Sequence, residues 1–478
     1  MSSDKVPPPN SGITPEDWQQ TPVSVRVWVT ALGAEIKQLK ETVEKLQEIV
    51  KRNSQNSSQP PSQDRPDQKP VKEKPSQPRK RGGQPRHRGH HRMLVAQPDE
   101  IIAHKSVSCA RCGALLLGED PKPHRHQVTE LPIVKARVVE HQVHRLTCPC
   151  CGLVNRGELP REVATSQFGV NVMSLVGLLM GRYRLSKRQV AQLLRECFGI
   201  EMAASTVVNH QKVLSEALAG PVAELQPYVQ GQPSCNVDET GWRQAGQLRR
   251  SWLWTVVTRH ATLFRIAPSR GSRVARELLG ENYAGTAGTD RYSAYSWLVW
   301  RQFCWSHLLR DFQKILERGG DSYAIGWHLK LQAEYLLMLW ARVRDGTLSY
   351  ADFMTEFPAI QALIRYWLTA GLDATLSRTA ATCRQLLDGE TSLWHFVTSP
   401  GVEPTNNSAE RALRHPVIWR RTSHGTQSDP GSQFVERILS MVETCRQQQR
   451  PVFDFLRQAL IAYRAGLPAP SLLPALQP

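Results

Sequence analysis

Two aspartates stand where a folded chain could bring them together for metal-assisted chemistry. Asp238 ends a predicted strand that begins at Ser234, ahead of a turn at Gly241, and Asp290 ends a second predicted strand, Gly285–Asp290. Two carboxylates a few ångströms apart cannot both stay ionised unless a cation neutralises them. Hard oxygen ligands favour Mg²⁺ or Mn²⁺, and two such ions can activate one oxygen while they stabilise a leaving one. The two aspartates are therefore predicted to hold divalent metal.

A third carboxylate would complete such a site. Glu403 and Glu410 are the candidates, one on each side of a predicted helix start at Pro404. We favour Glu410, because a rigid helix positions a ligand better than a loop residue before a proline. Arg411 and Arg414 stand beside Glu410 and would suit a phosphate backbone.

The elements around the aspartates follow the order β-β-β-α-β-α-β-α. They are Ser234–Gly241, Ser251–Thr258, Thr262–Ile266, a helix at Ser272–Leu279, Gly285–Asp290, and Arg301–His307 leading into a helix through Lys314. This is the order of a ribonuclease-H-like domain with a mixed five-stranded sheet, in which the first and fourth strands are neighbours. Asp238 and Asp290 would then meet at one edge of the sheet. The alternative is that both are ordinary strand-end caps or ion-pair partners.

About 120 residues separate Asp290 from Glu410. Two stretches within them, Leu329–Arg342 and Met354–Trp367, have the apolar periodicity of helices. The simplest account is a helical insertion, residues 319–400, in a catalytic domain that comprises residues 229–318 and 401–466. The insertion could consist of ordinary core helices or could present a functional surface, and both interpretations stay open.

Two cysteine pairs have the spacing of zinc knuckles. They are Cys109 with Cys112 and Cys148 with Cys151, each followed by a glycine that permits a tight turn. Four thiolates make a closed tetrahedral shell, so we expect one structural Zn²⁺. The domain would be zinc-ribbon-like, residues 101–165, with strands from the valine-rich stretch Ile133–Val143. Cys150 is an extra thiol, and buried cysteines without metal are the alternative.

The first 51 residues contain a heptad pattern. Apolar residues step by four and three from Val25 to Val50, with charged and amide residues between them. This spacing predicts a short coiled coil. One amphipathic helix packed on its own chain is the alternative. We favour self-association, because no apolar chain follows immediately for the helix to cover.

Residues 52–100 form a polar linker that is predicted to be disordered and becomes basic toward its end. Between residues 79 and 92 there are six Lys and Arg, three His and no acid. The six are Arg79, Lys80, Arg81, Arg86, Arg88 and Arg92. An acid-free cluster of this kind fits an arm that contacts DNA phosphates better than a solvated linker.

Residues 166–228 are predicted to be helical. Ser186 can cap one helix, Gly199 can end it and Ser205 can cap the next, which is a helix-turn-helix pattern. The second helix would present four polar side chains outward: Thr206, Asn209, His210 and Lys212. A purely structural helical pair fits nearly as well.

The C-terminal part is predicted to be scaffold. Trp419, Arg420 and Arg421 indicate a basic loop, and Ser432–Gln449 a long helix packed behind the sheet. Its buried side chains would be Phe434, Ile438, Met441 and Val442. Residues 467–478 are predicted to be disordered.

The composition of the 478-residue chain narrows the functional class. It carries 60 Lys and Arg against 43 Asp and Glu, a net charge of +17, which favours a polyanionic partner. No run of about 18 apolar residues is present, so a membrane-spanning helix is not expected. The N-terminus does not have the pattern of a secretory signal. Ten cysteines in such a chain indicate reduced thiols or metal ligands rather than disulfides.

Four blocks of the sequence resemble the catalytic blocks of the insertion-sequence-66 (IS66) family of bacterial DDE transposases. They are Asp238-Glu-Thr, Thr289-Asp290-Arg-Tyr-Ser-Ala-Tyr295, Cys304-Trp-Ser-His307-Leu-Leu-Arg310-Asp-Phe312 and Asn406-Asn407-Ser-Ala-Glu410-Arg411-Ala-Leu-Arg414. The heptads, the basic arm and the cysteine pairs also resemble that family's front end, so the resemblance spans most of the chain. It implies Asp238, Asp290 and Glu410 as the metal triad, with His307 and Arg310 near the DNA strand.

The function we expect is that of a DNA transposase. It would hydrolyse the phosphodiester at the transposon ends with two Mg²⁺ or Mn²⁺ ions, and the freed 3′-hydroxyl would attack target DNA. Double-stranded DNA would also contact Arg411, Arg414, Arg420 and Arg421. We expect a homodimer or higher oligomer, possible help from accessory proteins of the same element, no membrane partner, and a location in the bacterial cytoplasm at the nucleoid. The alternatives are a non-catalytic, sequence-specific DNA-binding protein and a ribonuclease-H-like nuclease without strand transfer.

Overall fold

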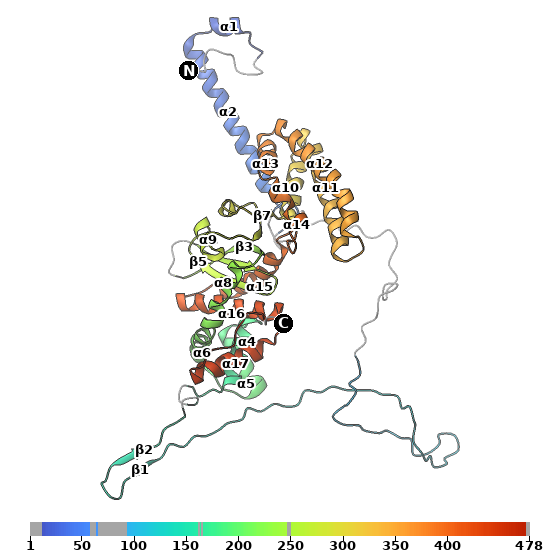
Figure 1. Cartoon of the computed structure of the whole chain (residues 1–478), viewed down its shortest axis with the longest axis vertical. Coiled ribbons are helices and arrows are strands. Elements are labelled where there is room, and N and C mark those ends of the chain that lie inside the picture. The colour runs from blue at the N-terminus through green and yellow to red at the C-terminus, as the bar shows by residue number, and fades with distance from the viewer. Residues whose placement is uncertain are drawn as a thin grey trace.

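The computed structural model describes residues 12–57, 64–65, 93–160, 163, 166–245 and 250–474. The basic residues predicted to contact DNA phosphates, Arg79 to Arg92, lie outside these ranges. A projecting N-terminal helix, an extended segment, a body around one sheet and a bundle of further helices make up the described chain (Figure 1). None of the helices in these ranges is long and apolar enough to cross a membrane.

The central sheet has five strands in the spatial order β5-β4-β3-β6-β7. The strands β3 (Ser234–Trp242), β4 (Ser251–Val257) and β5 (Thr262–Ala267) are antiparallel neighbours. The strands β6 (Thr286–Thr289) and β7 (Arg301–Phe303) continue the sheet in parallel with β3. The predicted mixed five-stranded sheet is confirmed, and so is the adjacency of its first and fourth strands.

The strand β3 is longer than the sequence predicted. Its ladder with β4 runs from Asn236 to Trp242, so Asp238 lies in the middle of the strand and not at its end. The prediction was wrong because Gly241 was taken as a turn, whereas the ladder with β4 keeps it in an extended strand. Burial alternates along β3, which places Asp238 on the face opposite to that of the buried Val237 and Glu239.

Different helices cover the two faces of the sheet. The helix α15 (Asn407–Ser423) packs on β3 and β4, on the face that carries Asp238. On the opposite face, the buried Glu239 accepts a hydrogen bond from Tyr295 in η4 (Ser293–Tyr295), which packs against α9 (Ser272–Leu279). Asp238 is therefore enclosed between its own strand and α15.

The helix α16 (Asp429–Gln447) closes the free edge of the sheet at β5. Three alternate N–H groups of β5 donate to three side chains that are one helical turn apart on α16. The pairs are Thr262 with Thr444 at 3.1 Å, Phe264 with Ser440 at 2.9 Å and Ile266 with Glu436 at 2.6 Å. This arrangement satisfies an edge that would otherwise present unpaired donors.

The helices before the sheet share its hydrophobic core. The helices α4 (Val170–Gly181), α5 (Lys187–Phe198) and α6 (Ala204–Ala217) join one cluster with the sheet, α16 and α17 (Val452–Ala465). The scaffold helix predicted at Ser432–Gln449 corresponds to α16, with its four predicted apolar residues buried. The short helices α7 (Ala219–Ala223) and α8 (Leu225–Gln230) lead from α6 into β3.

The predicted helix-turn-helix is formed only in part as expected. Ser186 caps α5 in a capping box, and Gly199 ends that helix in the left-handed region at φ +65°. Ala203, not Ser205, stands at the start of α6, and its side chain makes no capping hydrogen bond. His210 does not face outward: it is buried edge-on against Phe168, because the face of α6 that carries it packs into the core.

Residues 319–400 form helices around a second core. These are α11 (Asp321–Arg344), α12 (Tyr350–Ala370), η5 (Gly371–Asp373), α13 (Ser377–Asp388) and α14 (Thr391–Thr398). They pack on β7 and on α10 (Trp305–Glu317), the helix that follows the sheet. Trp305 of α10 donates to the Leu393 carbonyl at 2.9 Å, which ties the insertion to the sheet.

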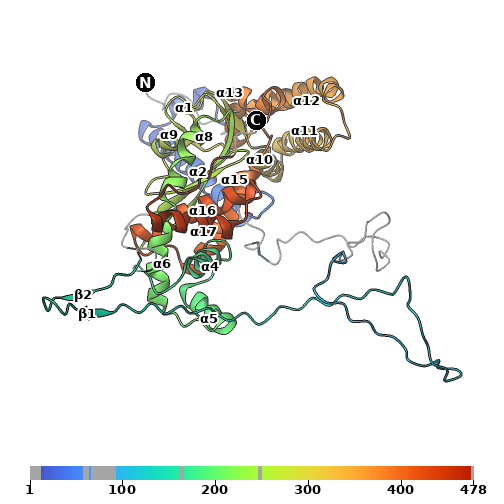
Figure 2. The same ribbon diagram turned by 60° about the horizontal axis from the view of Figure 1, so that its bottom comes forward.

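The described segments before residue 166 lack the close packing of the body. The heptad segment forms one helix, α2 (Val23–Val50), after the short α1 (Pro15–Gln20), and its apolar residues such as Leu39 and Leu46 are exposed. Residues 93–160 run apart from the body in both views (Figures 1 and 2). Their only strands in the described ranges are β1 (Arg145–Thr147) and β2 (Val154–Arg156). The strands predicted at Ile133–Val143 were therefore wrong, since that exposed stretch has no pairing partner.

Candidate active site

Asp238 lies on β3, and Asp290 follows directly after the neighbouring strand β6. The register of β3 and β6 pairs Asn236 with Gly288, and each aspartate follows one of these partners by two residues. Burial raises the pKa of Asp238 well above its ordinary value, and the charges of Glu239, Asp290 and Glu410 raise it further. Three acids from three distant parts of the sequence thus come within electrostatic reach of one another.

The turn after β6 holds Asp290 in place. The Asp290 carboxylate accepts a hydrogen bond from the Tyr292 N–H at 2.9 Å. The buried Arg301 guanidinium donates to the Thr289 hydroxyl at 2.8 Å and to the Tyr292 carbonyl at 2.9 Å. Burial lowers the pKa of Arg301 to about 10, so it stays charged at neutral pH. This cation fixes the turn through the Thr289 hydroxyl and the Tyr292 carbonyl.

Glu410 is placed by the first turn of α15. Asn406, at the start of that helix, is buried and donates from its side-chain nitrogen to the Val237 carbonyl at 2.9 Å. Its backbone N–H donates to the Cys304 sulfur at 3.1 Å. The backbone N–H of Glu410 in turn donates to the Asn406 carbonyl at 3.2 Å. Asn406 therefore ties the start of the helix that carries Glu410 to the strand of Asp238.

The other candidate for the third acid lies apart. Glu403 is half exposed and pairs with Arg344 of α11 at 3.8 Å. The helix begins at Asn407 and not at Pro404 as predicted. The Pro404 carbonyl accepts the Trp305 N–H at 2.9 Å and so connects to α10 instead of to a helical ladder.

Close packing of α15 on β3 depends on small side chains. Asn236 donates from its side chain to the Ser408 hydroxyl of α15. A Cβ at Gly288 on the neighbouring strand would overlap the Asn236 side-chain oxygen. Further along the same face, Arg420 donates to the Thr240 hydroxyl at 3.2 Å. The contacts of Asn236 and Thr240 with α15 thus lie on either side of Asp238 along β3.

Two residues of α10 face Glu410. The His307 Nδ1 lies 3.6 Å and the Arg310 Nη2 3.5 Å from the same carboxylate oxygen. Burial lowers the pKa of His307, and the charge of Arg310 lowers it further, so the imidazole is neutral at neutral pH. Both residues were predicted to lie near the DNA strand, and the structure brings both to the acids.

The charge of the acids fits a divalent cation. None of the ion pairs within 4 Å in the described ranges involves Asp238 or Asp290. One group of three potential ligands, Cys304, His307 and Glu410, has atoms within 4.8 Å of one another. Burial raises the pKa of the Cys304 thiol to about 11, so the thiol is protonated and unsuited to a hard cation. The carboxylates are the ligands that Mg²⁺ or Mn²⁺ would take.

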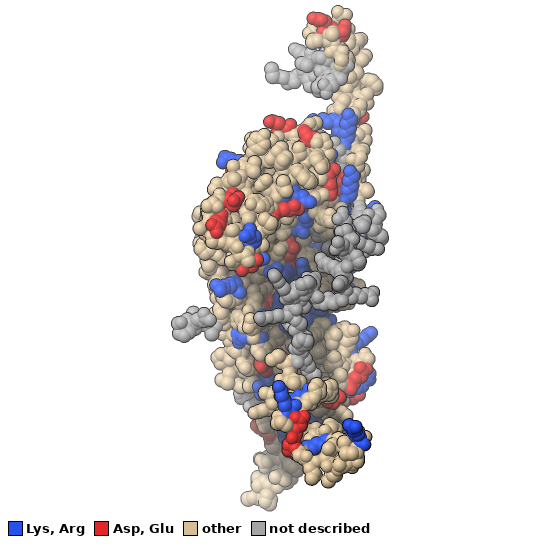
Figure 3. Space-filling model, turned by 90° about the vertical axis from the view of Figure 1, so that its right-hand side faces the viewer, with Lys and Arg blue, Asp and Glu red and all other residues tan. Residues whose placement is uncertain are grey.

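The basic residues after Glu410 lie on a helix. Arg420 and Arg421 belong to α15, so the predicted basic loop was wrong: the helix extends to Ser423. Arg411, Arg414 and Arg421 are exposed, whereas Arg420 is half-buried against Thr240. Lys and Arg side chains gather in the middle of the face that Figure 3 shows, below the helical insertion.

Sequence reasoning missed several residues that position the acids. Asn406 was part of a recognised block, but its contact with the strand of Asp238 was not foreseen. Arg291, which directly follows Asp290, forms an ion pair with Asp311 of α10 at 2.6 Å. Asn236 carries no local signal, because its partner Ser408 is remote in sequence, and the role of Arg301 depends on the turn between two strands.

The four predicted zinc ligands form two separate knuckles. Gly113 and Gly152 each adopt φ +73°, and each donates its N–H to the carbonyl of the first cysteine of its pair at 2.9 Å. Backbone N–H groups that face the sulfurs of Cys109 and Cys148 lower the pKa of both thiols. Thiolate-favouring turns of this kind fit Zn²⁺. In the described ranges no group of three or more ligand atoms includes these cysteines, so the structure does not bring the knuckles together.

Comparison with protein families identifies the body that carries the acids. A family model described as "Transposase IS66 family" matches residues 166–434, more than half of the chain. The chain belongs to the IS66 transposase family. The IS66 resemblance of the sequence blocks is thereby confirmed. A second model, the "zinc-finger binding domain of transposase IS66", matches residues 107–152, which contain all four knuckle cysteines. A third, a family of unknown function (DUF6444), matches residues 7–93.

Two curated relatives of this IS66 family chain come from Sinorhizobium fredii (strain NBRC 101917 / NGR234). "Uncharacterized protein y4qI" is 26% identical over 259 residues, which cover 49% of this chain and 47% of the relative. "Uncharacterized protein y4hP" is 21% identical over 388 residues, 73% of this chain and 69% of the relative. The chain therefore spans about half the length of the first and about two thirds of the second.

Proposed function

We propose that this IS66 family chain is a metal-dependent DNA transposase with Asp238, Asp290 and Glu410 as its catalytic acids. The observation that supports the proposal is that Asp238 on β3, Asp290 directly after β6 and Glu410 on α15 lie within electrostatic reach of one another. The strand order β5-β4-β3-β6-β7, in which β4 alone runs opposite to the other four strands, supports a ribonuclease-H-like catalytic domain.

Asp238, Asp290 and Glu410 would hold two Mg²⁺ or Mn²⁺ ions. Such ions, when bound, lower the pKa of an attacking water and stabilise the charge on a leaving oxygen. The protein positions the ligands: β3 is pinned by ladders on both sides, and Arg301 fixes the turn that presents Asp290. A preorganised acid cluster of this kind limits the reorganisation that the reaction needs.

His307 and Arg310 would contact the phosphate that reacts. Arg310 lies 3.5 Å from Glu410 and can donate to a phosphate oxygen beside that carboxylate. The neutral imidazole of His307 could hold or pass a proton through Nδ1, which has no hydrogen-bond partner in the described ranges. Water would cleave the phosphodiester at a transposon end, and the freed 3′-hydroxyl would then attack a phosphodiester of target DNA and release one of its 3′-oxygens.

The remaining segments would hold and pair the DNA ends. We assign end binding to the basic arm, to a zinc-ribbon-like domain at residues 101–165 and to the helices of residues 166–228. Exposed apolar residues on α2 support self-association, because a heptad seam needs a partner helix. A dimer or higher oligomer would bring two ends together, and accessory proteins of the same element would complete the assembly.

The test uses labelled DNA with the element's own ends, a target plasmid and Mg²⁺. Wild type is compared with Asp238→Asn and with Asp388→Asn, a matched change of an exposed aspartate on α13. The proposal predicts joined product from wild type and Asp388→Asn and none from Asp238→Asn. Cleavage without joining would select a nuclease, and binding without cleavage would select a non-catalytic DNA-binding protein.

A further inference from the structure

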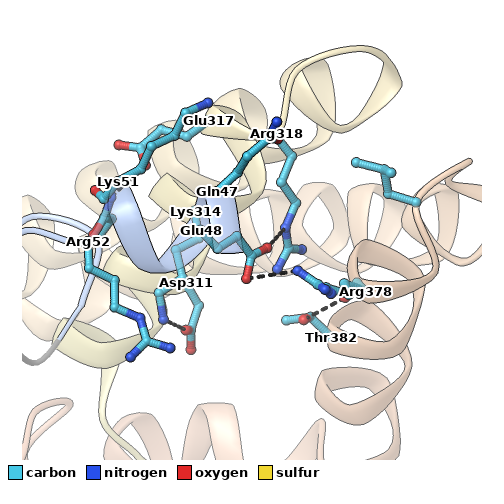
Figure 4. Close-up of a pocket in the computed structure, with 12 residues that line it drawn as sticks. Gln47, Glu48, Lys51, Arg52, Asp311, Lys314, Glu317, Arg318, Arg378 and Thr382 are labelled. Atoms are coloured by element: carbon cyan, nitrogen blue, oxygen red, sulfur yellow. Dashed lines mark hydrogen bonds and ion pairs between the residues drawn. The ribbon is translucent and has the colours of Figure 1, made fainter. Parts of the chain in front are cut away.

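The end of α2 docks on the catalytic body through one carboxylate. Glu48 contacts Arg318, the residue directly after α10, at 3.1 Å with one oxygen and Arg378 of α13 at 3.2 Å with the other (Figure 4). Both arginines are largely buried, with 13% and 24% of their side chains exposed. Glu48 thus enters a site lined by two elements that are remote from it in sequence.

A cavity of about 280 Å³ surrounds this contact, and its lining is basic. Its five cationic residues are Lys51, Arg52, Lys314, Arg318 and Arg378, against three acids, Glu48, Asp311 and Glu317. Asp311 already pairs with Arg291 and Lys314, and Glu317 accepts hydrogen bonds from Asn56 and Gln313. Of the three acids in the lining, Glu48 is the one that contacts both arginines.

The cavity lies on the helix that also borders the catalytic acids. Arg310 and Lys314 lie one turn apart on α10, Arg318 caps the C-terminus of that helix four residues further on, and Arg310 contacts Glu410. Eight residues of helix span about 12 Å. A DNA strand advances about 3.4 Å per nucleotide, so a strand held at the acids would reach the cavity roughly three to four nucleotides away.

The guanidinium groups of Arg318 and Arg378 both contact the Glu48 carboxylate. Two guanidinium groups placed in this way could equally bind one phosphate group. Arginine donates its parallel N–H groups to carboxylate and phosphate oxygens alike. We propose that Arg318 and Arg378 form a phosphate-binding site for the DNA strand that leads to the active site, and that Glu48 occupies this site in the absence of DNA. The inference rests on the proposed function, since it takes DNA as the substrate. The other interpretation is a brace that only attaches α2 to the body.

Substitution of Glu48 separates the two interpretations. The full chain with Glu48→Gln is compared with wild type for binding to a fluorescent duplex oligonucleotide without Mg²⁺, over a range of salt concentrations. Removal of the competing carboxylate is expected to tighten binding about fivefold or more. The matched control is Glu35→Gln, an exposed glutamate of α2, which should leave the affinity unchanged.

The arginines supply the second half of the test. Arg318→Gln with Arg378→Gln removes two phosphate contacts, so the slope of log affinity against log salt should fall by about 2. Adding Glu48→Gln to this pair should produce no further tightening. The double variant Arg318→Lys with Arg378→Lys keeps both charges, so its slope of log affinity against log salt should equal that of wild type. An unchanged slope in this variant would show that the Gln pair lost phosphate contacts and not its fold. Arg365→Gln, on the exposed surface of α12, is the control for charge.

Equal affinity of Glu48→Gln and wild type, or an equal gain in the background without the two arginines, would overturn the inference. Glu48→Gln could bind the duplex more tightly only when both arginines are present, while the same chain yields no joined product in the strand-transfer assay. This result would support the phosphate site and would overturn only the transposase proposal. Failure of every variant to bind the duplex would overturn both.

Discussion

The side chain of Asn406 donates a hydrogen bond of 2.9 Å to the carbonyl of Val237, the residue before Asp238. Asn406 precedes the helix of Glu410, so this bond connects two of the three acids through the backbone. The geometry of the site thus depends on a neutral residue that holds no metal.

Replacement of Asn406 tests this connection. Asn406→Ala removes the bond and leaves the buried Val237 carbonyl unpaired, which should cost about 1–3 kcal/mol of unfolding free energy. It should also reduce the stabilisation of the protein by Mg²⁺, which a merely structural defect would leave intact. Asn407→Ala is the control, because Asn407 only accepts from Ser306 at 3.3 Å in a partly exposed contact. Equal Mg²⁺ responses in both variants would argue against a positioning role.

The pH dependence of stability should reveal the charge on Asp238. Its pKa is raised in the folded protein, so the protonated carboxyl group favours folding. This contribution is complete below about pH 4 and is lost as pH rises through the raised pKa. In a chelator at pH 8, Asp238→Asn should therefore melt at a higher temperature than wild type, and the difference should vanish in acid. Mg²⁺ should stabilise wild type but not the variant. Calorimetry with Asp388→Asn as control measures both effects.

The edge of the sheet offers a test of the fold. Ser440→Ala removes the acceptor of the buried Phe264 N–H and should lower the unfolding free energy by about 1–3 kcal/mol in denaturant titrations. Ser377→Ala, at an exposed position of α13, should change it by less than about 0.5 kcal/mol. Similar losses in both variants would mean that α16 does not close this edge in solution.

Zinc should bring the two cysteine knuckles together. We expect one zinc per chain after anaerobic purification, because four thiolates complete a tetrahedral shell. Zinc removal by a chelator should speed proteolysis within residues 93–160, since binding and folding are coupled in such sites. Cys148→Ser should lose the metal, whereas Cys150→Ser should retain it. Metal analysis that finds no zinc in the wild-type protein would refute the prediction.

The basic arm should contribute through salt-dependent binding. Replacement of its six Lys and Arg between residues 79 and 92 by Gln should lower DNA affinity. The salt slope should fall by roughly 5 if all six contact phosphates. Fluorescence anisotropy at several salt concentrations measures the slope, and an unchanged value would identify the segment as a linker.

The sequence by itself determined the elements whose signals are local. The heptads predicted the helix α2, the capping residues Ser186 and Gly199 predicted α5, and the strand pattern predicted the mixed sheet. The acids and the cysteine pairs could be selected because their residue types and spacing limit the chemistry that they can perform. Propensity, capping and periodicity act over a few residues, so they can be read without a fold.

Only the tertiary structure decided what depends on contacts between distant segments. The ladder with β4 extended β3 beyond Asp238, packing buried His210, and the contact of Pro404 with Trp305 moved the start of α15. The bond from Asn406 to β3 and the cavity that receives Glu48 join segments more than 160 residues apart. Such partners leave no local pattern, because their energy comes from burial and pairing that exist only once the chain has folded.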